Sequence, residues 1–116
     1  MAFDTAISGI NAASADLNVI SNNIANASTV GYKTSRAEFA DVFATSLLGA
    51  GGNAIGKGVS LSAVTQEFGQ GNISFTDNAL DLAISGGGFY PLSVDGALQY
   101  TRAGNFQVDS DGYLVT

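Results

Sequence analysis

The chain has 116 residues, with ten acidic and four basic side chains and a formal net charge of −6. Scattered bases in an acidic chain neutralise phosphate poorly, so we expect no binding to nucleic acid. The chain lacks Cys and His, which excludes disulfides, Cys or His metal sites, a His general base and a thiol nucleophile. We therefore expect no metal, no cofactor and no catalytic residues, and hence no enzyme.

The low charge content suggests that part of the surface contacts protein. Only 12 % of the residues are charged, about half the share usual in a soluble domain. No stretch reaches the roughly 20 apolar residues of a membrane span, and the first residues lack the basic and apolar regions of a secretory signal. We expect no membrane insertion and no cleaved signal peptide.

The first segment carries a helical pattern. Apolar residues recur at alternating steps of three and four, which predicts a helix over about residues 3–27 with a heptad seam. We expect the large side chains of this seam to pack against helices of neighbouring subunits. They are Phe3, Ile10, Leu17, Ile20 and Ile24. A plain amphipathic helix that packs on its own domain is the alternative.

The other positions of this helix are small and polar, where a solvated helix normally carries Lys and Glu. Asn, Ser, Thr and Gly are poor helix formers, so we expect the isolated segment to be frayed in water and to fold on assembly. Four amides are expected to bond laterally to neighbours or to cap the helix. They are Asn18, Asn22, Asn23 and Asn26.

The next segment is predicted to connect two domains. The helix should end within residues 26–31, where turn-forming residues lead to a glycine. A short helix over 36–48 is expected next, followed by a flexible linker and domain boundary at 49–53. Six glycines are expected to let this connection change shape. They are Gly31, Gly49, Gly51, Gly52, Gly56 and Gly58.

From Val59 onward the apolar pattern has the period of two that is typical of strands. Asp95-Gly96 and Asp111-Gly112 are predicted hairpin turns. The expected strands are 59–64, 72–75, 82–85, 89–94, 98–101, 106–108 and 113–115. Because the chain stops directly after a hairpin, we expect further protein to follow.

The predicted fold class is α+β. A long N-terminal coiled-coil-forming helix (1–30) is followed by an extended connecting region (31–58) and an antiparallel all-β portion (59–116).

Three short motifs resemble ligand sites incompletely. Residues 51–57 match the start of a phosphate-binding loop, but Gly58 stands where Ser or Thr would hold magnesium. Residues 86–88 match part of a dinucleotide loop, but Pro91 replaces its last glycine. Residues 109–112 begin like a calcium loop whose remainder is absent. A linker or turn explains each motif better, and an enzyme or binding module built on the β portion is a minor alternative.

Three ordered blocks of sequence resemble the bacterial flagellar rod and hook family. The first comprises residues 21–26, 29–33 and 36–39, the second 70–73, 78–84 and 88–90, and the third 100–106 and 109–115. Within this family, residues 8–17 and 39–43 are most similar to hook subunits, and a distal rod subunit is the alternative.

The resemblance implies a structural subunit that self-assembles into the flexible tube joining rod to filament and transmits motor torque. It also implies that the N-terminal helix lines the inner core and packs with a C-terminal helix that this chain lacks. The implied partners are further copies of the chain, the distal rod, the hook cap, the hook–filament junction and the flagellar export apparatus. The implied location is the extracellular hook or basal body, reached without a cleaved signal peptide.

Overall fold

The computed structural model describes residues 2–43 and 55–116, which divide into two compact units. The first unit comprises Met1–Ala25 and Thr34–Glu67, and the second comprises Asn26–Lys33 and Phe68–Thr116. Each unit therefore combines segments that are far apart in the chain, because a strand near residue 60 returns to pair with one near residue 38. The glycines at 49, 51 and 52, and the predicted linker around them, lie outside the described residues.

Helix α1 spans Ala2–Ala25, which confirms the helix predicted from the apolar pattern. Asp4 lies in its first turn, where a negative charge interacts favourably with the helix dipole. Beyond its end, the Thr29 amide donates to the Asn26 carbonyl at 3.0 Å. Gly31 then adopts a φ of 76°, in the left-handed region that glycine enters without steric cost.

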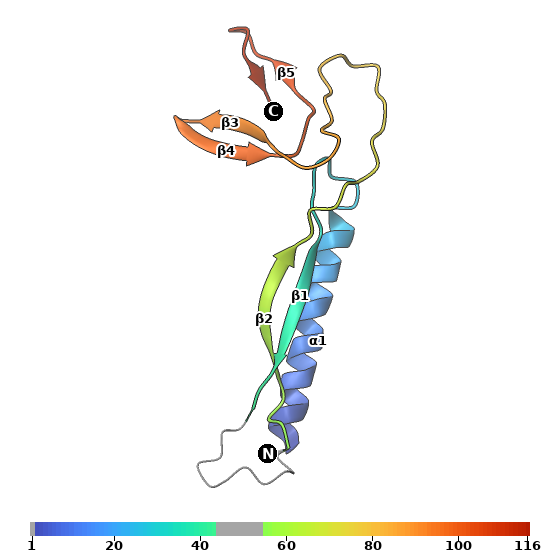
Figure 1. Cartoon of the computed structure of the whole chain (residues 1–116), viewed down its shortest axis with the longest axis vertical. Coiled ribbons are helices and arrows are strands. Elements are labelled where there is room, and N and C mark those ends of the chain that lie inside the picture. Colours follow the sequence, from blue (N-terminus) through green and yellow to red (C-terminus); the bar gives the residue numbers. More distant parts are fainter. Residues whose placement is uncertain (1, 44–54) are drawn as a thin grey trace. The chain divides into compact units, whose positions relative to one another are not determined.

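Strands β1 (Ser35–Asp41) and β2 (Val59–Gln66) form an antiparallel ribbon beside α1 (Figure 1). Ser35 lies opposite Gln66 and Asp41 opposite Val59, with a shift in register between Glu38 and Phe39. The strand predicted at 59–64 is thus confirmed.

The short helix predicted over 36–48 is wrong where the structure describes that segment. Residues 36–41 belong to β1, because they pair with β2 and bury Ala37 within the first unit. Such tertiary contacts override a weak local preference for helix. Residues 44–48 lie outside the described part of the chain.

A small charge cluster lies on the ribbon. The Arg36 guanidinium contacts the carboxylates of Glu38 at 3.0 Å and Glu67 at 3.4 Å. The hydrogen bond that Arg36 donates to Glu38, together with the negative charges of Glu38 and Glu67, raises the pKa of Arg36 above its ordinary value. Arg36 therefore stays charged at any physiological pH. Because the side chains are well exposed to solvent, we expect a small contribution to stability.

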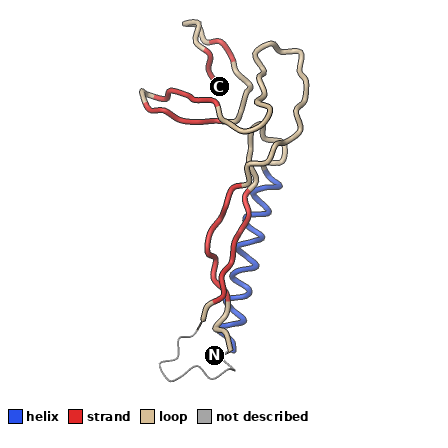
Figure 2. The backbone as a smooth tube through the Cα atoms, viewed as in Figure 1, coloured by secondary structure: helices blue, strands red, loops and turns tan. Residues whose placement is uncertain are grey.

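In the second unit, β3 (Tyr90–Val94) pairs with β4 (Ala97–Thr101), and β5 (Gln107–Val108) pairs with β6 (Leu114–Val115) (Figure 2). Both pairs are antiparallel, as predicted, and join at the two expected Asp-Gly turns. At the first turn, Asp95 and Gly96 have φ values of 50° and 83°, which matches the turn type that Asp-Gly favours. The Tyr90 and Phe106 rings meet edge to face at 5.1 Å, and Phe106 is buried.

The strands predicted at 72–75 and 82–85 are wrong, because both segments are irregular. In the second segment, backbone groups bond outside any ladder. The Leu82 amide donates to the Gly104 carbonyl at 2.8 Å, and the Ile84 carbonyl accepts from the Arg102 guanidinium at 2.9 Å. The Arg102 side chain, which is distant in the sequence, thus bonds where a neighbouring strand would. The local alternation of residues gives no sign of such a contact.

Candidate assembly surface

One face of α1 is covered by the ribbon of its own unit (Figure 2). At 3.6 residues per turn, the half-buried positions fall on a single side of the helix. They include Ser8, Ala12, Ala15, Val19 and Asn23. These side chains are small or polar, so the ribbon backbone can approach the helix closely. Of the small polar positions noted in the sequence, Ser8 and Asn23 lie on this face, and most of the others are exposed.

The opposite face of α1 carries the large apolar side chains predicted as a seam, and we call these five residues the apolar stripe. Their exposed fractions are 83 % for Phe3, 69 % for Ile10, 62 % for Leu17, 43 % for Ile20 and 70 % for Ile24. Ile7, which the seam analysis omitted, is also exposed, one turn from Phe3. Exposed apolar patches of this kind mark surfaces that bind protein.

The four amides singled out in the sequence have different environments. Asn23 is half-buried and forms two hydrogen bonds with the backbone of Ser35. The Asn26 side-chain oxygen accepts from the Thr29 hydroxyl at 3.2 Å, just beyond the helix end. Asn18 and Asn22 are exposed. The structure thus places Asn23 against the ribbon, and Asn26 in the turn that follows α1.

The described glycines of the connecting region lie against other parts of their own units. A Cβ atom on Gly31 would overlap the backbone of Arg102 and Ala103, and one on Gly58 would overlap the Ser8 hydroxyl. A Cβ atom on Gly56 would lie 3.2 Å from the Asp41 carboxylate. Close approach of other atoms is therefore one reason for glycine at Gly31 and Gly58. Composition alone does not show whether a glycine serves close approach or flexibility.

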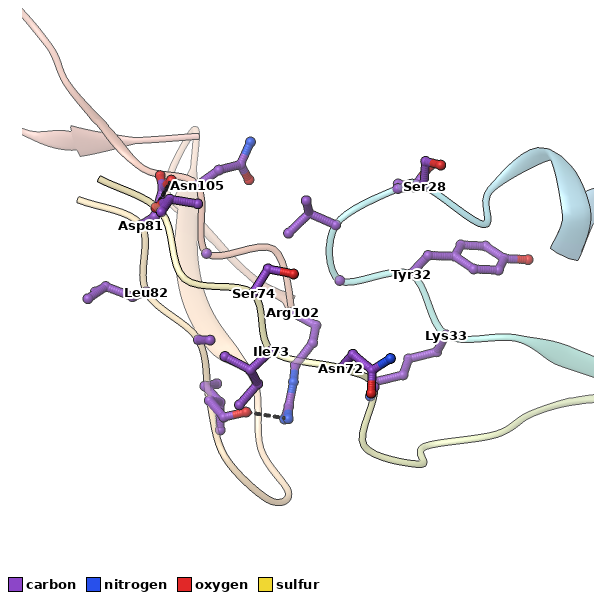
Figure 3. Close-up of a pocket in the computed structure, with 18 of the residues that line it drawn as sticks. Ser28, Tyr32, Lys33, Asn72, Ile73, Ser74, Asp81, Leu82, Arg102 and Asn105 are labelled. Atoms are coloured by element: carbon purple, nitrogen blue, oxygen red, sulfur yellow. Dashed lines mark hydrogen bonds between the residues drawn. The ribbon is translucent and has the colours of Figure 1, made fainter. Parts of the chain in front are cut away.

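The second unit contains an open pocket of about 570 Å³ (Figure 3). Its lining comes from residues 27–33, 71–76, 81–84 and 102–105. In Figure 3, Arg102 extends alongside Ile73 towards the Ile84 carbonyl. The Arg102 guanidinium also donates to the carbonyls of Gly86 and Gly88, and to the Gln70 side chain at 2.9 Å. This cation is therefore occupied in holding loops together.

Asp81, the carboxylate of the pocket, is engaged in a similar way. It accepts from the Thr76 hydroxyl at 2.7 Å and from the Asn78 amide at 3.1 Å. Within residues 2–43 and 55–116, no group of three Asp or Glu side chains could hold a metal ion. The same residues include no helix that is long and apolar enough to cross a membrane.

Comparison with known families is consistent with this geometry. The profile described as "Flagella basal body rod protein" matches residues 3–33, which contain α1. The profile described as "Flagellar hook protein FlgE/F/G D1 domain" matches residues 83–116, which contain β3 to β6. The two matches lie in the order expected from the sequence blocks.

Individual relatives agree with the profiles. The flagellar hook protein FlgE of Escherichia coli is 44 % identical over 116 residues, covering 99 % of this chain and 27 % of the relative. The flagellar basal-body rod protein FlgG of Buchnera aphidicola subsp. Schizaphis graminum is 42 % identical over 120 residues, which cover 93 % of this chain and 46 % of the relative. The flagellar hook protein FlgE of Helicobacter pylori is 41 % identical over 123 residues, which cover 95 % of this chain and 17 % of the relative.

This chain belongs to the flagellar hook and rod protein family.

The family consists of structural components of the flagellum, and the resemblance drawn from the three sequence blocks is confirmed. This hook and rod family member spans less than half the length of each relative named above. Hook and rod relatives match it at nearly the same identity, so identity does not separate the two branches.

Proposed function

We propose that this chain is a structural, non-enzymatic part of a flagellar hook subunit, which polymerises into the flexible tube joining rod to filament. The observation that carries the proposal is the apolar stripe, which lies on the face of α1 that its own ribbon leaves open. The similarity of residues 8–17 and 39–43 to hook subunits favours the hook over the rod.

The stripe supplies a driving force for self-association. Burying a large apolar side chain contributes about 1.5–3 kcal/mol, so the five residues of the stripe contribute roughly 7.5–15 kcal/mol before entropy is counted. The heptad spacing suits coiled-coil packing of α1 against helices of neighbouring subunits. Asn18 and Asn22 lie on exposed parts of the same helix and could bond to those neighbours.

The hook subunit has further expected partners in the flagellum and an expected route of export. Besides further copies of itself, the subunit meets the distal rod at one end of the tube, and the hook cap and hook–filament junction at the other. It reaches the extracellular hook through the flagellar export apparatus. These assignments rest on the similarity to flagellar hook and rod proteins.

Electron microscopy of detached basal structures from cells lacking this gene tests the proposal. Rods that end without hooks are expected, and a plasmid copy of the gene should restore hooks. Unaltered flagella would overturn the assignment to the flagellum.

A distal rod subunit is the second candidate, because the rod protein FlgG of Buchnera aphidicola is 42 % identical over 93 % of the chain. The same micrographs decide between the two. Truncated rods would assign the chain to the rod, whereas complete rods without hooks would assign it to the hook.

A further inference from the structure

Two side chains of α1 form hydrogen bonds with the backbone at opposite ends of the β1–β2 ribbon. At one end, the Asn23 side-chain amide donates to the Ser35 carbonyl at 2.7 Å, and the Ser35 amide donates to the Asn23 side-chain oxygen at 3.0 Å. At the other end, the Val59 amide donates to the Ser8 hydroxyl at 3.3 Å. The Ser8 hydroxyl in turn donates to the Thr5 carbonyl at 2.7 Å, so its orientation is fixed.

The bonded backbone groups lie at the two ends of the ribbon. Ser35 is the first residue of β1, and Val59 lies opposite Asp41, the last residue of β1. An isolated two-stranded ribbon leaves the outward amides of both strands without ladder partners. Asn23 and Ser8 supply acceptors for two of these amides.

The spacing on the helix matches the spacing on the ribbon. Residues 8 and 23 are separated by about 22 Å along a helix that rises 1.5 Å per residue. Residues 35 and 41 are separated by about 20 Å along a strand that rises 3.3 Å per residue. Both contacts can therefore form together in one alignment of ribbon and helix, and a slip by one residue would break both.

We propose that Ser8 and Asn23 are positioning residues, forming a two-ended clasp that fixes the axial alignment of the ribbon on α1. The clasp keeps the ribbon on the small-residue face and leaves the apolar stripe open. Gly58 contributes to one end, because it packs so closely on Ser8 that a Cβ atom would overlap the hydroxyl. Two-stranded ribbons are marginally stable alone, so side-chain bonds at both ends matter more here than in a large sheet.

Amide hydrogen exchange of the whole 116-residue chain, measured by NMR, tests the clasp. The two amides that the clasp should protect are those of Ser35 and Val59. Loss of one hydrogen bond is expected to speed exchange of its amide about 3- to 10-fold. Asn23→Ala should therefore accelerate exchange at Ser35 more than at Val59. Ser8→Ala should give the reverse pattern.

Matched controls use the same substitutions at exposed positions of the same helix, Asn11→Ala and Ser14→Ala. Alanine favours helix at all four positions, so a loss of protection at the ribbon cannot come from weaker helix propensity. Exchange at Val42 and Glu67, whose amides bond to the carbonyls of Gly58 and Thr34 within the first unit, reports whether the ribbon of a variant still forms. Equal exchange at Ser35 in Asn23→Ala and Asn11→Ala would overturn the proposal, as would equal acceleration at both ends in each clasp variant.

A consequence for polymerisation rests on the proposed function and is measured separately. If the clasp keeps the stripe open, the variant that combines Ser8→Ala and Asn23→Ala should complement a deletion strain less well than the variant that combines the two control substitutions. The number of hooks per cell measures complementation. Altered exchange with normal assembly would keep the clasp and overturn only this consequence. A failure of the proposed function itself would appear earlier, as unaltered flagella in the deletion strain.

Discussion

At the scale of single residues, Arg102 shows why one basic side chain cannot replace another. Its guanidinium donates to the backbone carbonyls of Ile84, Gly86 and Gly88 and to the Gln70 side chain. Arginine presents five donors in a planar fork, whereas lysine presents three from a single nitrogen. Loop segments that lack a strand ladder are thus held by one side chain that directly follows β4.

We expect Arg102→Lys to destabilise the second unit by about 2 kcal/mol, because hydrogen bonds to a charged group contribute about 1.5–3 kcal/mol and lysine cannot reach all four acceptors. All four tyrosines lie in this unit, so urea unfolding followed by tyrosine fluorescence measures it selectively. Arg36→Lys is the matched control, since it alters an exposed ion pair of the first unit and is expected to leave the midpoint nearly unchanged. Equal midpoints for wild type and Arg102→Lys would contradict this role.

At the scale of elements, α1 is a helix with two faces of different purpose. The face with mostly small side chains packs on the ribbon, and the apolar stripe lies opposite. A charge introduced into the stripe should therefore leave the monomer folded and affect association alone. This separation of effects would not be expected for a helix whose large side chains formed the core of its own domain.

Leu17→Asp is expected to abolish hook assembly, because burying a carboxylate in an apolar contact costs several kcal/mol per subunit. Asn11→Asp adds the same charge at an exposed polar position of α1 and should preserve assembly. Circular dichroism and tyrosine fluorescence should show both variants folded like wild type. Intact hooks from cells that carry only the Leu17→Asp protein would contradict the proposed packing.

Elements with strong local signals were predictable from the sequence, whereas those made by distant contacts were not. The apolar period gave α1 to within two residues at each end, and Asp-Gly turns gave both hairpins. Strand β1 was mistaken for a helix because its partner, β2, follows a long connection. Likewise, Asn23 was expected to bond laterally or cap, yet its contact with Ser35 depends on where the ribbon lies. The five residues of the stripe follow from the apolar period of the sequence, whereas their packing against neighbouring subunits stays a prediction.

At the scale of the whole molecule, charge opposes the association that the stripe favours. The net charge is −6, and three of the four bases already have partners. Lys33 donates to the Gly69 carbonyl at 2.6 Å, Arg36 contacts two glutamates, and Arg102 bonds to backbone carbonyls. Copies of the chain should therefore repel one another at long range while their apolar stripes attract at contact.

Raising the salt concentration is expected to strengthen association of the purified chain, since screening shortens the reach of this repulsion. The Debye length falls from about 30 Å at 0.01 M to about 8 Å at 0.15 M, so most of the gain should come below 0.15 M sodium chloride. Sedimentation velocity at a series of salt concentrations measures it. If association rose only at molar salt, hydrophobic salting-out would be the cause, and repulsion between the negatively charged copies would not limit association. Leu17→Asp serves as the control, because without an intact stripe, screening alone should produce no association at any of these concentrations.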